Sequence, residues 1–145
     1  MGCACSRPRG EVPDIHYTMK EALVRIPGGA YVDGCEITIF CEGKQYVSNH
    51  IYPEFLGLEE KISKVLNGKP WVNCELPKVK KLLSKDFKDD KAFKRGRYDA
   101  CEDFVRHIVE NPCLITTDAI EFFNIGEPHK SVFKKYQSEL QKTTS

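Results

Sequence analysis

A long stretch from Asp89 to Asn111 has the hydrophobic pattern of an amphipathic helix, and the rest of the chain is organised around it. Apolar side chains recur there at intervals of three and four residues, which is the spacing of one helical face. Asp89 and Asp90 suit the positive amino-terminal end of this helix, and Pro112 stops it. The residues of the predicted face are Phe93, Arg97, Ala100, Cys101, Phe104, Val105, Ile108 and Val109.

Arg97 is the charged member of that face. It lies one turn after Phe93 and one turn before Cys101, so its aliphatic stem starts among apolar side chains. Arginine is rarely buried without a partner. Two interpretations stay open: a nearby acid neutralises Arg97 inside the fold, or Arg97 binds an external anion.

The first third of the chain predicts three strands. An extended segment runs from Ile15 to Ile26, with Ala22 and Val24 sharing a face with Ile26, and Pro27 and two glycines end it. Two further strands flank Glu42-Gly43. Alternation is clearest in the first of them, at Ile37, Ile39 and Cys41, and the second covers Lys44 to His50.

The remainder predicts helices. One begins near Pro53 with an inward face of Phe55, Leu58, Ile62, Val65 and Leu66. A loop from Trp71 to Lys81 leads to the long helix. A short helix follows, capped by Thr116 or Thr117, with Ile120, Phe122 and Phe123 packed inward. The last segment places Val132, Phe133, Tyr136 and Leu140 on one side, so it either docks on the domain or forms a small interaction helix.

Strands followed only by helices indicate an α+β domain, in which a small three-stranded antiparallel sheet packs against a helical subdomain. At 145 residues we expect one domain, with residues 1–14 as a flexible leader and 127–145 as a helical tail. The net charge of +1 gives no global field that would favour nucleic acid. No apolar run approaches the ~20 residues of a membrane span.

The seven cysteines occur without a C-x-x-C pair or zinc-finger spacing, so we expect a reducing, intracellular compartment and no metal site. No phosphate-binding glycine motif is present. Cys101 and His107 point in different directions on one helix, so they form no nucleophile–base pair. We therefore expect no catalytic residue, no cofactor and no enzymatic activity.

The chain begins MGCACS. Removal of Met1 would expose Gly2, and Ser6 stands where the N-myristoylation pattern requires a hydroxyl residue. One myristoyl chain gives marginal membrane binding, while a second acyl chain on Cys3 or Cys5 makes an anchor stable. The leader therefore predicts a lipidated amino terminus, with a coincidental Met-Gly start as the alternative.

Four short motifs in the same order resemble those of the PX (phox-homology) domain family, over about Ile15 to Ile125. The family's R-R-Y-x-x-F aligns with His50 to Phe55, and its L-P-x-K loop with Leu76 to Lys78. A basic residue followed by an apolar-spaced run aligns with Arg97 and then Phe104 to Pro112. The closing pattern is matched by Pro112, Leu114, Thr117, Ile120 and Phe123.

The resemblance implies a groove between sheet and helices that takes a phosphoinositide headgroup. It assigns Tyr52 to the inositol ring and Lys78 to the phosphate next to the membrane, with Lys80 and Lys81 as neighbours. Arg97 would grip the inositol hydroxyls or the outer phosphates. Ordinary surface lysines and a structural Tyr52 are the alternatives.

The sequence departs from the family at Ile51, which replaces the arginine that binds the 3-phosphate. His50, just before it, is a weaker substitute. Losing one charge-assisted contact costs about 1.5–3 kcal/mol, so recognition of the 3-phosphate is placed in doubt. Trp71 is a candidate for membrane insertion, because indole favours the interface; a half-buried structural tryptophan is the alternative.

Together these patterns predict a monomeric peripheral membrane protein at the cytoplasmic face of an endosomal, vesicular or plasma membrane. Its partner would be a phosphoinositide or an anionic membrane surface. The rival hypothesis is a lipid-anchored adaptor whose PX-like domain binds a protein. Arg97 exposed in an empty groove would favour lipid, and Arg97 paired with Glu54 or another carboxylate would favour the adaptor.

Overall fold

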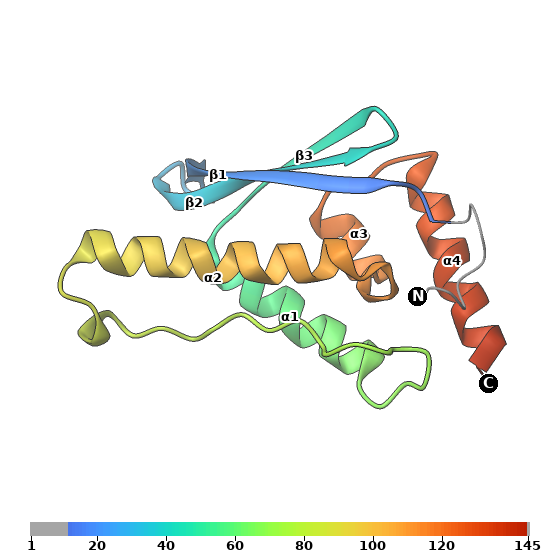
Figure 1. Ribbon diagram of the computed structural model, residues 1–145. Helices are drawn as coiled ribbons and strands as arrows, with labels where there is room; N and C mark the ends of the chain where they lie inside the picture. Colours follow the sequence, from blue (N-terminus) through green and yellow to red (C-terminus); the bar gives the residue numbers. More distant parts are fainter. Residues whose placement is uncertain (1–11, 145) are drawn as a thin grey trace.

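The computed structural model describes residues 12–144 and has an α+β architecture, with one antiparallel sheet lying over a set of helices (Figure 1). The strands are β1 (Ile15–Arg25), β2 (Tyr31–Cys41) and β3 (Lys44–His50). The α-helices of the described residues are α1 (Tyr52–Leu66), α2 (Asp90–Glu110), α3 (Thr117–Phe122) and α4 (His129–Thr144), with 3₁₀ turns η1 (Ser84–Asp86) and η2 (Pro112–Leu114). The predicted α+β class with a three-stranded antiparallel sheet, and the predicted order of strands before helices, are confirmed.

The strands follow one another as a meander in the order β1-β2-β3. The register places Ile37 of β2 between Met19 of β1 and Ser48 of β3. Glu42 and Gly43 form the tight turn between β2 and β3, with positive φ angles of 48° and 87° that suit a two-residue hairpin loop. This turn lies where the sequence predicts it.

Alternation along β2 turns Cys35, Ile37 and Ile39 toward the helices, where all three are buried. Ala22 pairs with Gly34, one position out of phase with Cys35, so the face of β1 that carries Ala22 and Val24 is the outer one. The inward face of β1 carries Ile15, Tyr17 and Met19 opposite Cys41, Ile39 and Ile37.

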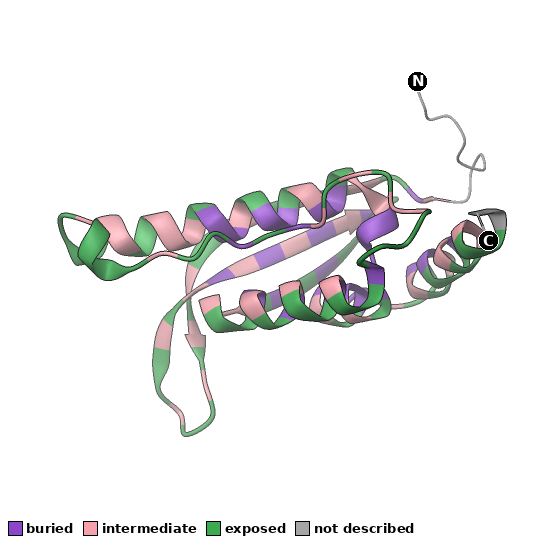
Figure 2. Ribbon diagram, turned by 90° about the horizontal axis from the view of Figure 1, so that it is seen from below, coloured by how far each residue is buried: buried purple, intermediate pink, exposed green. Residues whose placement is uncertain are grey.

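The β1–β2 hairpin extends beyond β3. The pairing of β3 with β2 ends at Cys35, whereas β1 stays paired with β2 as far as Tyr31. Residues 21–34, called the hairpin arm below, form this extension, and Glu21 and Asp33 near its base contact α2. None of the residues in this arm is buried, and it is drawn in the exposed and intermediate colours of Figure 2. The arm therefore relies on polar contacts rather than on the core.

The helices begin at residues that satisfy their free backbone N–H groups. The Asp89 side chain accepts the Ala92 N–H at 2.8 Å at the start of α2, and Thr116 accepts the Ala119 N–H at 3.2 Å at the start of α3. Of the two caps that the sequence predicts, Thr116 and Thr117, the structure uses Thr116. Ile51 before α1 has no side-chain acceptor, and the Glu54 carboxylate instead accepts the Ile51 N–H at 2.9 Å.

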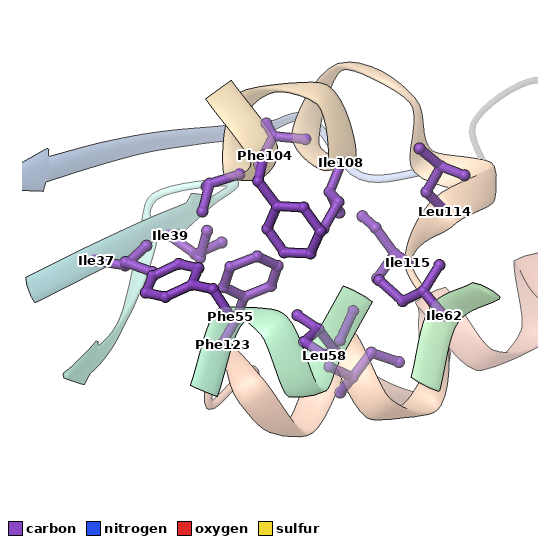
Figure 3. Packing of buried hydrophobic residues seen from close by; sticks show 14 of the residues in the cluster. Ile37, Ile39, Phe55, Leu58, Ile62, Phe104, Ile108, Leu114, Ile115 and Phe123 are labelled. Carbon is purple, nitrogen blue, oxygen red and sulfur yellow. The ribbon is translucent and has the colours of Figure 1, made fainter. Parts of the chain in front are cut away.

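The core lies between the inward face of the sheet and the helices α1, α2 and α3 (Figure 3). Phe55 of α1 and Phe104 of α2 meet edge to face, with ring centroids 6.3 Å apart, and both are almost completely buried. The predicted burial of Val65 is wrong, because 45% of it is exposed. The buried stripe of α1 advances by four residues from Leu58 to Ile62 to Leu66, and this spacing leaves Val65 beside the stripe rather than on it.

The last helix, α4, packs against the end of the sheet and against α3. Phe133 is completely buried and belongs to the core cluster. His129, at the start of α4, lies with Nδ1 2.7 Å from the Tyr46 hydroxyl and Nε2 3.1 Å from the Glu42 carboxylate. The segment predicted as a tail is therefore docked on the domain. None of the helices formed by residues 12–144 is both long and apolar enough to cross a membrane.

Candidate functional site

A cavity of about 830 Å³ opens between the hairpin arm, the start of α1 and the amino-terminal half of α2. The arm contributes Glu21 and Asp33 to its lining, and α1 contributes Tyr52. From α2, Phe93 and Arg97 face the same space. The cavity lies at the junction of sheet and helices, where segments distant in the sequence meet.

Arg97 is held by aromatic rings rather than by an acid. Its guanidinium carbon lies 4.1 Å from the centroid of the Tyr52 ring and 5.0 Å from that of Phe93, which are cation–π distances. Among residues 12–144 no carboxylate forms an ion pair with Arg97, and its buried Nε has no acceptor. Within that range, therefore, no acid neutralises Arg97 in the way that the first of the two interpretations supposed.

Tyr52 is held by its backbone at the start of α1 and by a hydrogen bond of its hydroxyl group. It is the first residue of α1, and its hydroxyl donates a hydrogen bond of 2.8 Å to the carbonyl oxygen of Lys80. This bond ties the loop before η1 to α1. It also orients the ring that supports Arg97, so Tyr52 and Arg97 lie together and only the backbone of Lys80 adjoins them.

His50 turns toward the core and its ring is engaged on every side. Nε2 donates to the Phe122 carbonyl oxygen at 2.7 Å, and the imidazole stacks on the Phe122 ring with centroids 3.6 Å apart. Nδ1 lies 3.1 Å from a Glu54 carboxylate oxygen. In this conformation neither nitrogen points a free donor into the cavity. Because Glu54 contacts His50 and the Ile51 N–H, it also does not reach Arg97.

The three predicted lysines lie outside the cavity lining. Lys78, Lys80 and Lys81 are exposed, while the neighbouring Pro77 and Val79 are buried and fix this loop on the domain. Only Lys80 is linked to the site, through its backbone carbonyl. The lysine side chains thus project from the loop into solvent.

Trp71 packs against the hydrophobic core as a half-buried residue. Its Nε1 is buried without a hydrogen-bond partner among the described residues, and the Lys69 ammonium lies 5.9 Å from the ring. The indole forms part of the edge of the core in this conformation. The predicted lipidation residues Gly2, Cys3 and Cys5 lie outside the described residues.

The sequence pattern did not reveal the ion pairs beside the cavity. Lys94 of α2 lies 2.8 Å from Asp33, and Arg95 lies 2.8 Å from Glu21. The hydrogen bond that the Lys94 ammonium donates to the Asp33 carboxylate raises the pKa of Lys94 above its ordinary value. These partners are separated by about sixty to seventy-five positions and carry no spacing signal; only the interleaving of acids and bases in the sequence hints at them.

Within the part of the chain that the structure describes, no three potential metal ligands come together. A comparison with protein-family models and with curated proteins finds no match in either set.

Proposed function

We propose that this protein is a lipid-anchored peripheral membrane protein whose PX-like domain binds phosphoinositide headgroups for membrane targeting or trafficking. The observation that carries the proposal is Arg97, which lines the cavity, has no carboxylate partner among residues 12–144 and is held in place by two rings. A planar guanidinium fixed in this way suits phosphate or paired hydroxyl oxygens.

The size and position of the cavity support the same proposal. Its volume of about 830 Å³ falls within the ~300–1,000 Å³ typical of small-ligand sites. It opens between the sheet, the start of α1 and α2, which is where a resemblance to the PX family would place the headgroup groove. The resemblance rests on motifs from the same elements, at Tyr52 and Arg97.

The exposed lysines would act on the membrane surface rather than inside the cavity. Each Lys or Arg close to an anionic leaflet contributes about 1 kcal/mol, so Lys78, Lys80 and Lys81 together would favour the approach of this loop. An acylated leader would hold the domain at a high effective concentration of headgroups, where a pocket of modest affinity suffices.

The test is co-sedimentation of the unacylated full chain with vesicles that contain each phosphoinositide in turn. The Arg97→Ala variant should lose selective binding by roughly ten- to a hundredfold, because it removes a charge-assisted contact. The matched control is Arg106→Ala, later on α2, which removes the same charge from an exposed residue that pairs with Asp103 on its own helix and does not line the cavity. Equal losses in both variants, fading with salt, would contradict a pocket.

The anchor is tested separately in cells. Gly2→Ala removes the predicted acceptor of the myristoyl group, and we expect the protein to move from the membrane fraction to the supernatant. Unchanged membrane association of this variant would refute the lipid anchor without bearing on the cavity.

A second candidate function is the lipid-anchored adaptor that binds a protein. Ile51, which carries no charge, and the position of the three lysines outside the lining favour it. No selective phosphoinositide binding in the vesicle experiment, together with normal folding, would make this the better hypothesis.

A further inference from the structure

The hairpin arm is attached to α2 by two ion pairs that lie beside the cavity. Lys94 bonds Asp33, and Arg95 bonds Glu21, each at 2.8 Å. All four side chains are more than half exposed. Exposed pairs of this kind contribute little to stability, typically about 0–1 kcal/mol. Because these ion pairs add little to stability, we look for a role of the four residues in ligand binding.

The lining of the cavity is not basic overall. Its full charges are three carboxylates, on Glu21, Asp33 and Asp90, against two cations, on Lys94 and Arg97. Lys94 is already bonded to Asp33, and Asp90 raises its pKa further from one turn away. Arg97 is thus the single lining cation without a carboxylate partner among residues 12–144.

This charge pattern has a consequence for ligand choice. One phosphate can bind Arg97 with full charge assistance. A second phosphate would have to lie close to the carboxylates of the arm. Alternatively, it would have to replace Asp33 as the partner of Lys94, and the unpaired Asp33 carboxylate would then lie next to the phosphate. Juxtaposed like charges disfavour a partner, and discrimination between ligands commonly depends on such a repulsive element.

We propose that Glu21 and Asp33 are specificity-determining residues, which restrict the cavity to headgroups with one phosphate monoester and exclude those with two or three. The inference rests on the proposed headgroup function and adds the charge of the preferred ligand. The hairpin arm then acts as a charge filter, because its two acids line the cavity and pair with Lys94 and Arg95 of α2.

The experiment compares the full-length wild type with the double variant Glu21→Gln, Asp33→Asn. The vesicles carry phosphatidylinositol monophosphates, bisphosphates or the trisphosphate, and phosphatidylserine equalises their total charge. In the wild type we expect tighter binding to a monophosphate. In the double variant, binding to bisphosphate vesicles should tighten roughly tenfold relative to monophosphate vesicles, because Lys94 becomes free for a second phosphate.

The matched control is Asp99→Asn. Asp99 also pairs with Arg95, at 3.2 Å, but it does not line the cavity. It should change binding to all vesicles alike. Thermal unfolding of each variant checks that the fold is kept, which is expected because the pairs are exposed.

The outcomes separate the two proposals. If the wild type binds a monophosphate through Arg97 but the double variant keeps the same preference, the charge filter is refuted and the headgroup function stands. If the double variant tightens on every vesicle as Asp99→Asn does, the filter is likewise refuted. If only the double variant binds, the filter is supported and the headgroup function of the wild type is contradicted. If neither binds, both proposals fail.

Discussion

Gly34 lies where β2 passes closest to the end of β3. A Cβ atom added there would meet the His50 carbonyl oxygen at 2.4 Å and a Val24 methyl group at 2.8 Å. The carbonyl is backbone, so the strands would have to separate. We expect Gly34→Ala to lower the free energy of unfolding by about 3 kcal/mol, the upper end of the overpacking range, measured by urea denaturation.

Gly57 provides the matched control for this prediction. It lies inside α1, and nothing stands within 4 Å of a Cβ added there. Alanine is preferred over glycine inside a helix, so Gly57→Ala should raise the free energy of unfolding by about 0.5–1 kcal/mol. Equal effects of the two substitutions would show that the close approach at Gly34 is absent in solution.

At the same scale, the surroundings of a residue can be predicted from the sequence when they depend only on the helix or strand to which the residue belongs. Arg97 could be singled out because the face of a single helix defines its surroundings. The ring contacts of Arg97 with Tyr52 could not, since they depend on how α1 and α2 pack. His50 shows the same limit: its engagement by Phe122 arises from a contact 72 positions away, which no local pattern encodes.

At the scale of elements, α4 tests whether residues 127–145 form a separate tail. Phe133 is completely buried within the core cluster, so Phe133→Ala should destabilise the whole domain by about 3–5 kcal/mol, in a single urea transition. Lys134→Ala, next to it and exposed, should stay within about 0.5 kcal/mol of the wild type. Loss of α4 helicity with an unchanged transition for the remainder would instead support an independent tail.

The strands and helices themselves were predictable because alternation, helical spacing and caps are local signals. The turn at Glu42-Gly43 and the cap at Asp89 are examples. The hairpin arm was not predictable as an arm. Its residues have the pattern of an ordinary strand. Only the register shows the extension, because β3 pairs with β2 as far as Cys35 while β1 stays paired with β2 beyond it. The acids Glu21 and Asp33 therefore carried no sign of their place beside the cavity.

At the scale of the whole molecule, four cysteines of the described residues are distributed through the interior. Cys35 and Cys41 come from the sheet, Cys101 from α2 and Cys113 from η2, and all four are buried as free thiols. Burial, the largest cause in each case, raises the pKa of Cys35 and of Cys101 from 9.0 to about 12, and that of Cys41 to about 11. A thiolate at these positions would be desolvated.

These shifts make stability depend on pH on the alkaline side. The native state keeps the thiols protonated, whereas the unfolded chain releases their protons from about pH 9. The stabilisation is therefore fully present below pH 9 and is lost as the pH rises toward 12. For each thiol that keeps its proton in the native state, the free energy of unfolding falls by at most about 1.4 kcal/mol per pH unit above pH 9.

We expect the urea midpoint, measured in the presence of a reducing agent, to be flat between about pH 7 and 8.5 and to fall steadily up to about pH 10. Cys101→Ala removes one of the titrating groups, so its midpoint starts lower because of the cavity but declines less steeply. The slope is the decisive quantity, since the cavity affects all pH values alike. An identical slope in wild type and variant would mean that the thiol of Cys101 is accessible to water in the native state, and that the interior around α2 is looser than the structure describes.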